Sequence, residues 1–199
     1  MIKIKVNPVG RGLLGEKIMM PLCDAAQEQF DAFCVVPIVP ISQLFGGKLC
    51  AALDRQHPRD LFDVKLLLNN EGFTEEIKKG LIFGLVSSNR PTFEMLDPHL
   101  QDQRVAFMNQ FEGMSNVAFS YDDYEETRSE LIRLIRTRLT QEDKRFLISL
   151  NRLEPDWDIY DYQHYPSVKW KMVNLEKFRE HNHEAWRTQL ENLEMILTG

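Results

Sequence analysis

The feature that most constrains the fold is a short, densely charged segment in which two helices are expected to meet at a proline. Lys48 and Arg55 are seven residues apart, close to two helical turns, so both cations are expected on one face of the first helix. Pro58 suits the first position of a second helix. Asp60 then lies in its opening turn, where the positive end of the helix dipole favours a carboxylate, and Asp63 follows on the same side. The segment predicts a helix–turn–helix corner that gathers charges of both signs.

Two explanations of this charged corner stay open at the level of spacing. Lys48, Arg55 and Arg59 have the chemistry to bind a polyanion, and Asp60 and Asp63 have the chemistry to bind a metal ion. The same side chains also have the chemistry of a structural ion-pair network that joins two helices. The first explanation predicts a functional site, and the second predicts a scaffold.

Length and charge limit the classes of function. The 199 residues suffice for one domain with a helical extension, and 43% apolar and 27% charged residues are ordinary for a globular protein. The net charge of −6 is uneven, because residues 1–90 carry about +1 and residues 91–199 about −7. This distribution argues against a broad basic surface for duplex DNA. It leaves room for a local pocket for a nucleotide or an RNA end, and for an acidic half that docks a basic partner.

The sequence predicts a cytoplasmic protein. No run approaches the roughly 20 apolar residues of a membrane span, and the first residues, which include Lys3, Lys5 and Arg11, lack the apolar core of a signal peptide. The three cysteines are odd in number and too scattered for a metal knuckle, so they are expected to be buried free thiols. These cysteines are Cys23, Cys34 and Cys50.

Two strands are expected near the N-terminus. Residues 1–9 alternate apolar and polar side chains with the period of a half-buried strand, and residues 33–39 form a more continuously apolar strand whose Pro37 suggests an edge or a bulge. Gly10, Gly12 and Gly15 indicate a loop directly after the first strand. Because a strand at residues 1–9 must pair with something, its edge also offers a route to a homodimer.

From residue 42 onward the apolar period becomes helical. Ser42 is expected to cap a helix that ends near residue 53, and Thr74 to cap one that ends near residue 87. The further expected helices span residues 60–68, 121–139, 141–150 and 175–197. The fold class predicted is therefore α+β and predominantly helical, with residues 1–70 as one unit and residues 71–199 as a helical region packed on it.

Two other groups of possible metal ligands have ordinary structural explanations. Asp156 and Asp158 flank Trp157 in an Asp-x-Asp arrangement, but they belong to a tyrosine-rich segment that is more simply a loop packed on helices. His181 and His183 are two residues apart, so on a helix they point to different faces and are expected to be solvated.

Several blocks of the chain resemble the AbiEii/AbiGii nucleotidyltransferase-toxin family of bacterial type IV toxin–antitoxin and phage-defence systems. The resembling blocks are IKIKVNPV at residues 2–9, LFGGKLCAAL at 44–53, HPRDLFDV at 57–64, and PSVKWKMVNLE at 166–176. The resemblance implies a polymerase-beta-type nucleotidyltransferase fold in which residues 1–70 are a partial core. It also implies transfer of a nucleotide from an NTP to an RNA or protein acceptor, with Mg²⁺ as cofactor and a cognate antitoxin as partner.

Within this resemblance, Lys48, Asp60 and Asp63 match the catalytic positions of the later family motifs. Lys48, Arg55 and Arg59 are the implied phosphate-binding residues, and Asp60 or Asp63 the implied metal ligand. Nucleotidyl transfer needs carboxylates for the metal ions and cations for the phosphates, so the residue types agree with the chemistry.

The chain departs from the family pattern at its N-terminal end. The family's glycine turn and Asp-x-Asp strand do not precede Met1, and Lys5 stands where relatives carry a third carboxylate. A protonated ammonium has no lone pair with which to bind magnesium. Three alternatives follow: a truncated or degenerate nucleotidyltransferase, a catalytically inactive interaction protein that keeps the scaffold, and a chain whose coding start is misplaced.

Overall fold

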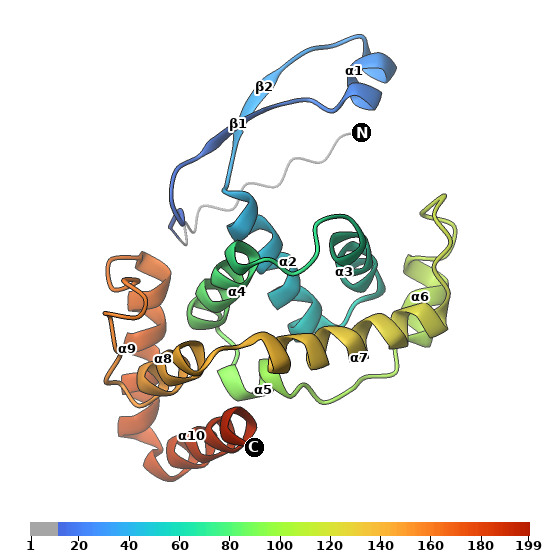
Figure 1. Cartoon of the computed structure of the whole chain (residues 1–199). Coiled ribbons are helices and arrows are strands. Elements are labelled where there is room, and N and C mark those ends of the chain that lie inside the picture. The colour runs from blue at the N-terminus through green and yellow to red at the C-terminus, as the bar shows by residue number, and fades with distance from the viewer. Residues whose placement is uncertain (1–11) are drawn as a thin grey trace.

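Helices dominate the chain in a computed structural model that describes residues 12–199 (Figure 1). The elements follow in the order β1 (Ile18–Pro21), α1 (Asp24–Phe30), β2 (Val35–Ile38), α2 (Ile41–Arg55), α3 (Pro58–Asn70), α4 (Glu75–Ser87), α5 (Thr92–Leu96), α6 (Arg104–Gln110), α7 (Tyr121–Arg138), α8 (Gln141–Asn151), α9 (Pro166–His181) and α10 (His183–Thr198). The predicted α+β, predominantly helical class is confirmed. No helix in this part of the chain is long and apolar enough to cross a membrane.

Strands β1 and β2 form a small antiparallel hairpin, with α1 at its closed end, that projects from the helical body (Figure 1). The strand predicted at residues 33–39 is confirmed as β2. The loop predicted around Gly10, Gly12 and Gly15 is confirmed for residues 12–17, whereas β1 after it was not predicted. Four residues are too few to show a clear alternation, and β1 is defined by its ladder with β2, in which Ile18 lies opposite Ile38. The strand predicted at residues 1–9 lies outside the described residues.

Local capping explains where most helices begin. Pro58 occupies the first turn of α3, as predicted, and the Thr74 hydroxyl accepts a hydrogen bond from the Ile77 N–H at the start of α4. Ser120 and Thr140 form reciprocal capping boxes with the acidic residues three positions later, so α7 and α8 begin at sharply defined points.

Two predicted helix boundaries are wrong. Ser42 does not cap α2, because the helix already begins at Ile41 and its first backbone bond runs from Leu44 N–H to Pro40 O. The long helix predicted over residues 175–197 is two helices, since the backbone at Asn182 leaves the helical region. The Asn182 side chain then caps α10 by accepting a hydrogen bond from the Ala185 N–H at 3.1 Å.

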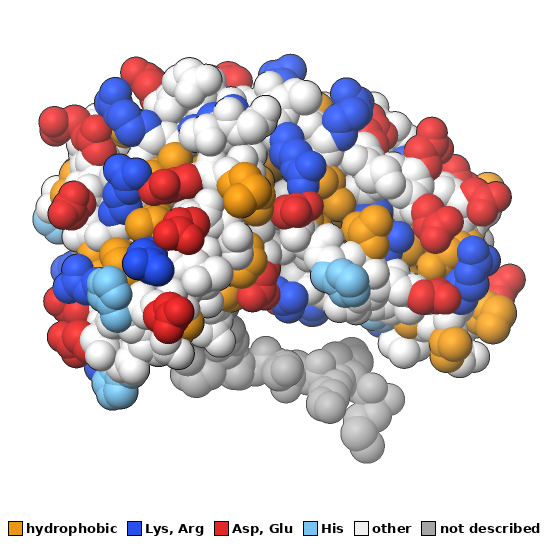
Figure 2. All heavy atoms as spheres, turned by 90° about the horizontal axis from the view of Figure 1, so that it is seen from below, with side chains coloured by type: hydrophobic (Ala, Val, Ile, Leu, Met, Phe, Trp, Pro, Cys, Tyr) orange, Lys and Arg blue, Asp and Glu red, His pale blue; other side chains and the backbone are white. Residues whose placement is uncertain are grey.

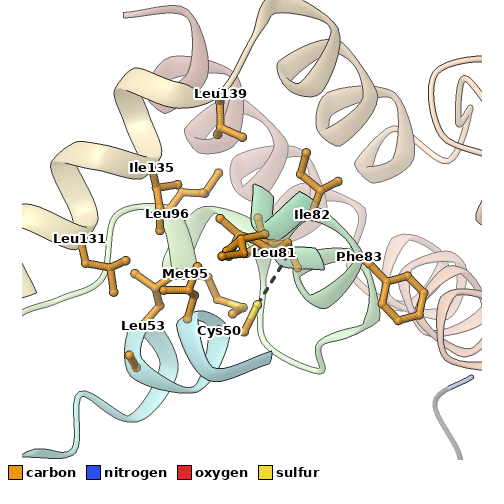
Figure 3. Packing of buried hydrophobic residues seen from close by; sticks show 14 of the residues in the cluster. Cys50, Leu53, Leu81, Ile82, Phe83, Met95, Leu96, Leu131, Ile135 and Leu139 are labelled. Atoms are coloured by element: carbon orange, nitrogen blue, oxygen red, sulfur yellow. Dashed lines mark hydrogen bonds between the residues drawn. The ribbon is translucent and has the colours of Figure 1, made fainter. Parts of the chain in front are cut away.

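The core forms around a very close crossing of α2 and α4 (Figure 3). A Cβ atom added to Gly46 would overlap the backbone of Gly80, and one added to Gly80 would overlap the Ser42 carbonyl. Next to this crossing, the buried Cys50 thiol donates to the Leu81 carbonyl at 3.7 Å. Only glycine allows two backbones to approach in this way.

Helices from later in the chain complete the same core. The side chains that pack around Leu53 of α2 come from three later helices and are fully or almost fully buried (Figure 3). They are Leu81 of α4, Met95 of α5, and Leu131 and Ile135 of α7. The buried cluster continues to Leu193 and Leu197 of α10. Buried residues from both sides of residue 70 therefore share one core. The division of the chain into residues 1–70 and 71–199 stays a prediction.

The prediction that all three cysteines are buried is wrong for two of them. Cys23 and Cys34 are exposed on the hairpin, and Cys50 alone among the three is buried. The apolar neighbours of Cys23 and Cys34 suggested burial, but the hairpin leaves many of its apolar side chains exposed, Met19, Phe30 and Phe33 among them.

A buried ion pair links α4 to α8. Lys78 Nζ lies 3.0 Å from Asp143 Oδ2, and both side chains are only 3% exposed. Burial alone would raise the pKa of Asp143, but hydrogen bonds from Tyr160, the Thr140 backbone and Lys78 outweigh it and lower the pKa below its usual value. For Lys78, burial opposes the charge, while Glu75 and Asp143 raise the pKa overall.

We expect Gly80→Ala to lower the free energy of unfolding by about 3 kcal/mol, because the new methyl group forces α2 and α4 apart. Gly47→Ala is the matched control, since its added Cβ meets no atom within 4 Å. It should instead stabilise α2 by about 0.5–1 kcal/mol through helix propensity. Urea denaturation of both variants measures the difference, and equal effects would contradict the close crossing.

We expect Asp143→Asn to lower the free energy of unfolding by about 2 kcal/mol at pH 7, because it removes the buried one of the two carboxylates that neutralise Lys78 and leaves only the more exposed Glu75. Since the folded pKa of Asp143 is lowered, its contribution is complete above the unfolded pKa of about 3.9 and disappears as the pH falls through the folded value. The difference in free energy of unfolding between the variant and the wild type, measured by urea denaturation, should therefore become smaller below about pH 4. Exposed Glu142→Gln is the control and should show no comparable gap.

Candidate functional site

The predicted charged corner forms two ion pairs between α2 and α3. The chain reverses between these helices, so Lys48, in the middle of α2, pairs with Asp63, near the middle of α3. Arg55 Nη2, at the end of α2, lies 2.8 Å from Asp60 Oδ1, near the start of α3. We call these the corner pairs. Both cations lie on the α3-facing side of α2, and both carboxylates face back, as the spacing predicted.

The corner pairs are accessible to solvent. The side chains of Lys48 and Arg55 are 42% and 62% exposed, and those of Asp63 and Asp60 are 39% and 18% exposed. Ion pairs this exposed contribute little to stability, in general roughly 0–1 kcal/mol each. They link the two helices, as the structural explanation expects, and they also leave both cations within reach of a ligand.

A small cavity of about 180 Å³ opens beside the pair of Lys48 and Asp63. Its other walls come from α2 and α3 and from the residue after α3: Phe45, Leu66, Leu67, Asn70 and Glu71. Arg55, Arg59 and Asp60 do not line it. Of the predicted site residues, the cavity therefore brings together only Lys48 and Asp63.

Arg59 is directed to a different neighbour. Its Nε and Nη2 atoms donate to the Gln110 carbonyl of α6, at 3.0 and 2.9 Å. His57 caps α3 by accepting from the Arg59 N–H at 3.2 Å, and its other ring nitrogen lies 3.1 Å from Gln110 Oε1. Arg59 and His57 thus attach the start of α3 to α6, and Arg59 is separate from the corner pairs.

Sequence reasoning missed the residue that fixes the corner, Gln56. It ends α2 in the left-handed conformation, with φ of 49°, and it is only 2% exposed. Its side-chain oxygen accepts from the Gln101 N–H at 3.1 Å and from Arg128 Nη1 at 3.2 Å, and its amide donates to the His99 carbonyl at 2.8 Å. The backbone carbonyl of Gln56 accepts from the Tyr124 hydroxyl at 2.8 Å.

This Gln56 network is a polar cluster inside the core. Tyr124 is fully buried, and burial raises its pKa to about 12 although Arg128 opposes the shift. Arg128 is 7% exposed, and its Nη1 also donates to the Gln101 carbonyl at 2.7 Å. No periodic pattern signals such a cluster, because each member lies among ordinary helix or loop residues and they meet only in the fold.

The other two candidate groups have the structural roles favoured from the sequence. Asp156 pairs with Arg145 at 3.3 Å, and Trp157 and Tyr160 of the same loop pack on Phe146. His181 and His183 are exposed and lie on different helices. Across residues 12–199 no group of three or more histidine, cysteine or acidic side chains is arranged to hold a metal ion.

The face of the molecule seen in Figure 2 carries charges of both signs. On the face shown in Figure 2, lysine and arginine side chains alternate with aspartate and glutamate over the helical body. This face carries no continuous basic surface of the kind that binds a duplex backbone.

Comparison with known protein families defines the class of the chain as a nucleotidyltransferase-type toxin. The family model described as nucleotidyl transferase AbiEii toxin, type IV TA system, matches residues 1–174. The chain therefore belongs to the AbiEii family, and the resemblance inferred from the sequence is confirmed. No curated protein and no solved structure was found to be similar. The matched range includes both corner helices and ends within α9, so α10 lies beyond it.

We expect Tyr124→Phe to lower the free energy of unfolding by about 2 kcal/mol, because the buried Gln56 carbonyl loses its donor and Arg128 loses an acceptor. Tyr121→Phe is the control, since this neighbouring hydroxyl is half-buried and bonds Asp102 and Gln103 at 3.3 and 3.2 Å. Loss of the Tyr121 hydroxyl should lower the free energy of unfolding clearly less than loss of the Tyr124 hydroxyl. Chemical denaturation compares them, and a Tyr124→Phe variant as stable as the wild type would argue against the Gln56 network.

Proposed function

We propose that this chain binds the phosphates of an NTP at the corner pairs, as part of transferring a nucleotide to an RNA or protein acceptor. Membership of the AbiEii family implies a nucleotide substrate and an antitoxin partner. The observation that carries the proposal is the placement of two exposed cations on one face of α2, with a cavity beside the first. Lys48 and Arg55 are about 10 Å apart along the helix axis.

The weakness of the corner pairs supports phosphate binding. Each cation is held by one carboxylate in a solvated position, so exchanging that partner for a phosphate oxygen costs little free energy. Arg55 offers a planar fork that can bind phosphate through two parallel hydrogen bonds, and Lys48 supplies a compact point charge. In this proposal Asp60 and Asp63 orient the cations before the nucleotide arrives.

Arg59 has a different role in the proposal. Because it already donates two hydrogen bonds to the Gln110 carbonyl, it serves to hold α3 against α6. These bonds use two of the five N–H groups of its guanidinium. A phosphate contact from Arg59, as the family resemblance implied, would therefore use the remaining donors while the side chain stays against α6.

The described residues alone do not fit the magnesium ion that nucleotidyltransferases typically use. Mg²⁺ needs near-octahedral oxygen ligands, but Asp60 and Asp63 belong to separate ion pairs and no third acidic ligand joins them within residues 12–199. The proposal therefore assigns nucleotide binding to the corner pairs and derives no step through the metal.

Lys5 supports a second candidate, a catalytically inactive family member that keeps the scaffold as an interaction protein. The resemblance places a carboxylate at this position, and lysine cannot replace it as a metal ligand. A labelled-nucleotide transfer assay separates the candidates, because turnover by the wild-type chain would exclude the inactive one. Lys5→Glu is the companion variant: if the lysine is what removed the activity, this variant should show nucleotide transfer that the wild-type chain lacks.

We expect calorimetric titration with each NTP to show saturable binding that Lys48→Ala weakens about tenfold or more, the usual result of losing a charge-assisted hydrogen bond. Arg55→Ala should have a similar effect. Arg187→Ala is the matched control, since Arg187 forms a comparably exposed ion pair with Glu191 on α10. Titrations with and without magnesium separate direct phosphate binding from metal-assisted binding.

Two results would overturn the site assignment. Equal heats for the wild type and Lys48→Ala would remove Lys48 from nucleotide binding. Equal weakening by Lys48→Ala and Arg187→Ala would reduce the effect to a general loss of positive charge.

A further inference from the structure

A second cavity, remote in sequence from the corner pairs, contains a buried cation. It measures about 230 Å³ and lies where the segment between α4 and α5 meets α9 and α10. Its walls are mostly apolar with a few amides: Asn89, Pro91, Trp170, Lys171, Asn174, Leu175, Phe178 and Gln189. An apolar cavity with few polar groups is the usual composition of a small-molecule site.

Lys171 is the unusual residue of this cavity. It is only 4% exposed, and its ammonium donates to the Ser88 and Arg90 carbonyls at 2.9 and 2.8 Å. An ammonium has three N–H donors, so two carbonyls leave one donor over. Within residues 12–199 no carboxylate pairs with Lys171, in contrast to buried Lys78, which contacts Glu75 and Asp143.

The absence of a nearby carboxylate affects the pKa of Lys171. Burial lowers the pKa of Lys171 to about 8, with no opposing acidic group. At neutral pH the amine is therefore still mostly protonated, and the cavity presents a cation that lacks an anion. Two carbonyls satisfy part of the ammonium but do not neutralise its charge, so an anion bound beside it would be stabilised by that charge.

The lining indicates what kind of anion fits. Two aromatic side chains, Trp170 and Phe178, with Pro91 and Leu175, suit a flat apolar body. The amides of Asn89 and Gln189 make no hydrogen bond to the described chain, so both are available to a carboxylate. A single lysine without an arginine fork favours a singly charged carboxylate over the more highly charged phosphate.

We propose that this cavity is a binding site for a small aromatic carboxylate, whose charge meets Lys171 and whose ring packs against Trp170 and Phe178. The volume lies below the roughly 300–1,000 Å³ of typical ligand pockets, so the ligand is limited to about one ring. The site is separate from the corner pairs and does not depend on nucleotide binding.

Calorimetry and thermal unfolding of the full chain with benzoate test this proposal. We expect saturable benzoate binding, a raised melting temperature, and at least tenfold weaker binding of benzamide, its neutral analogue. Lys171→Met, which keeps the length of the side chain but removes the charge, should weaken benzoate binding by a similar factor. Lys169→Met, on the exposed side of the same helix, should bind benzoate as the wild type does.

Several outcomes would overturn the proposal. Benzoate and benzamide binding with equal affinity would show that charge is not recognised, a test that needs no variant and so stands even where Lys171→Met fails to fold. Absence of saturable benzoate heat would make Lys171 a structural link between α9 and the residues after α4. Inorganic phosphate binding in place of benzoate, and lost in Lys171→Met, would contradict the carboxylate assignment.

Discussion

The close crossing of α2 and α4 is the contact on which the rest of this structure depends. Gly46 and Gly80 let the two backbones meet without intervening side chains, so α2 is fixed in the centre of the core. Its opposite side then carries Lys48 and Arg55 toward α3. A rigid central helix thus presents exposed cations, which is the arrangement that a preorganised binding site requires.

The Gln56 network adds precision to this arrangement. Gln56 joins the end of α2 to the loop before α6 and, through Tyr124 and Arg128, to α7. The turn between α2 and α3 is therefore held from inside the protein, while the corner pairs outside it are weak. The order of the corner comes from buried hydrogen bonds, including those of the Arg128 guanidinium, and its surface ion pairs remain available for exchange.

The sequence predicted what depends on local pattern and missed what depends on distant contacts. Pro58, Thr74 and the period of α7 sufficed for their helices, and the spacing of Lys48 and Arg55 correctly placed both on one face. The break at Asn182 was hidden because the apolar pattern continues across it. Gln56 and Lys171 carry no local signal, since their roles arise from carbonyls 43 and 83 residues away. The family resemblance predicted the class of protein, but the direction of Arg59 toward Gln110 required the structure.

The distribution of thiols over the two parts of the fold has a practical consequence. Cys23 and Cys34 are exposed on the hairpin, and Cys50 is enclosed at the crossing of α2 and α4. Alkylating reagents act on accessible thiolates, so they distinguish these positions without any engineered cysteine. The native chain therefore carries its own attachment points for a fluorophore or spin label on the hairpin, and delayed labelling of Cys50 reports opening of the core.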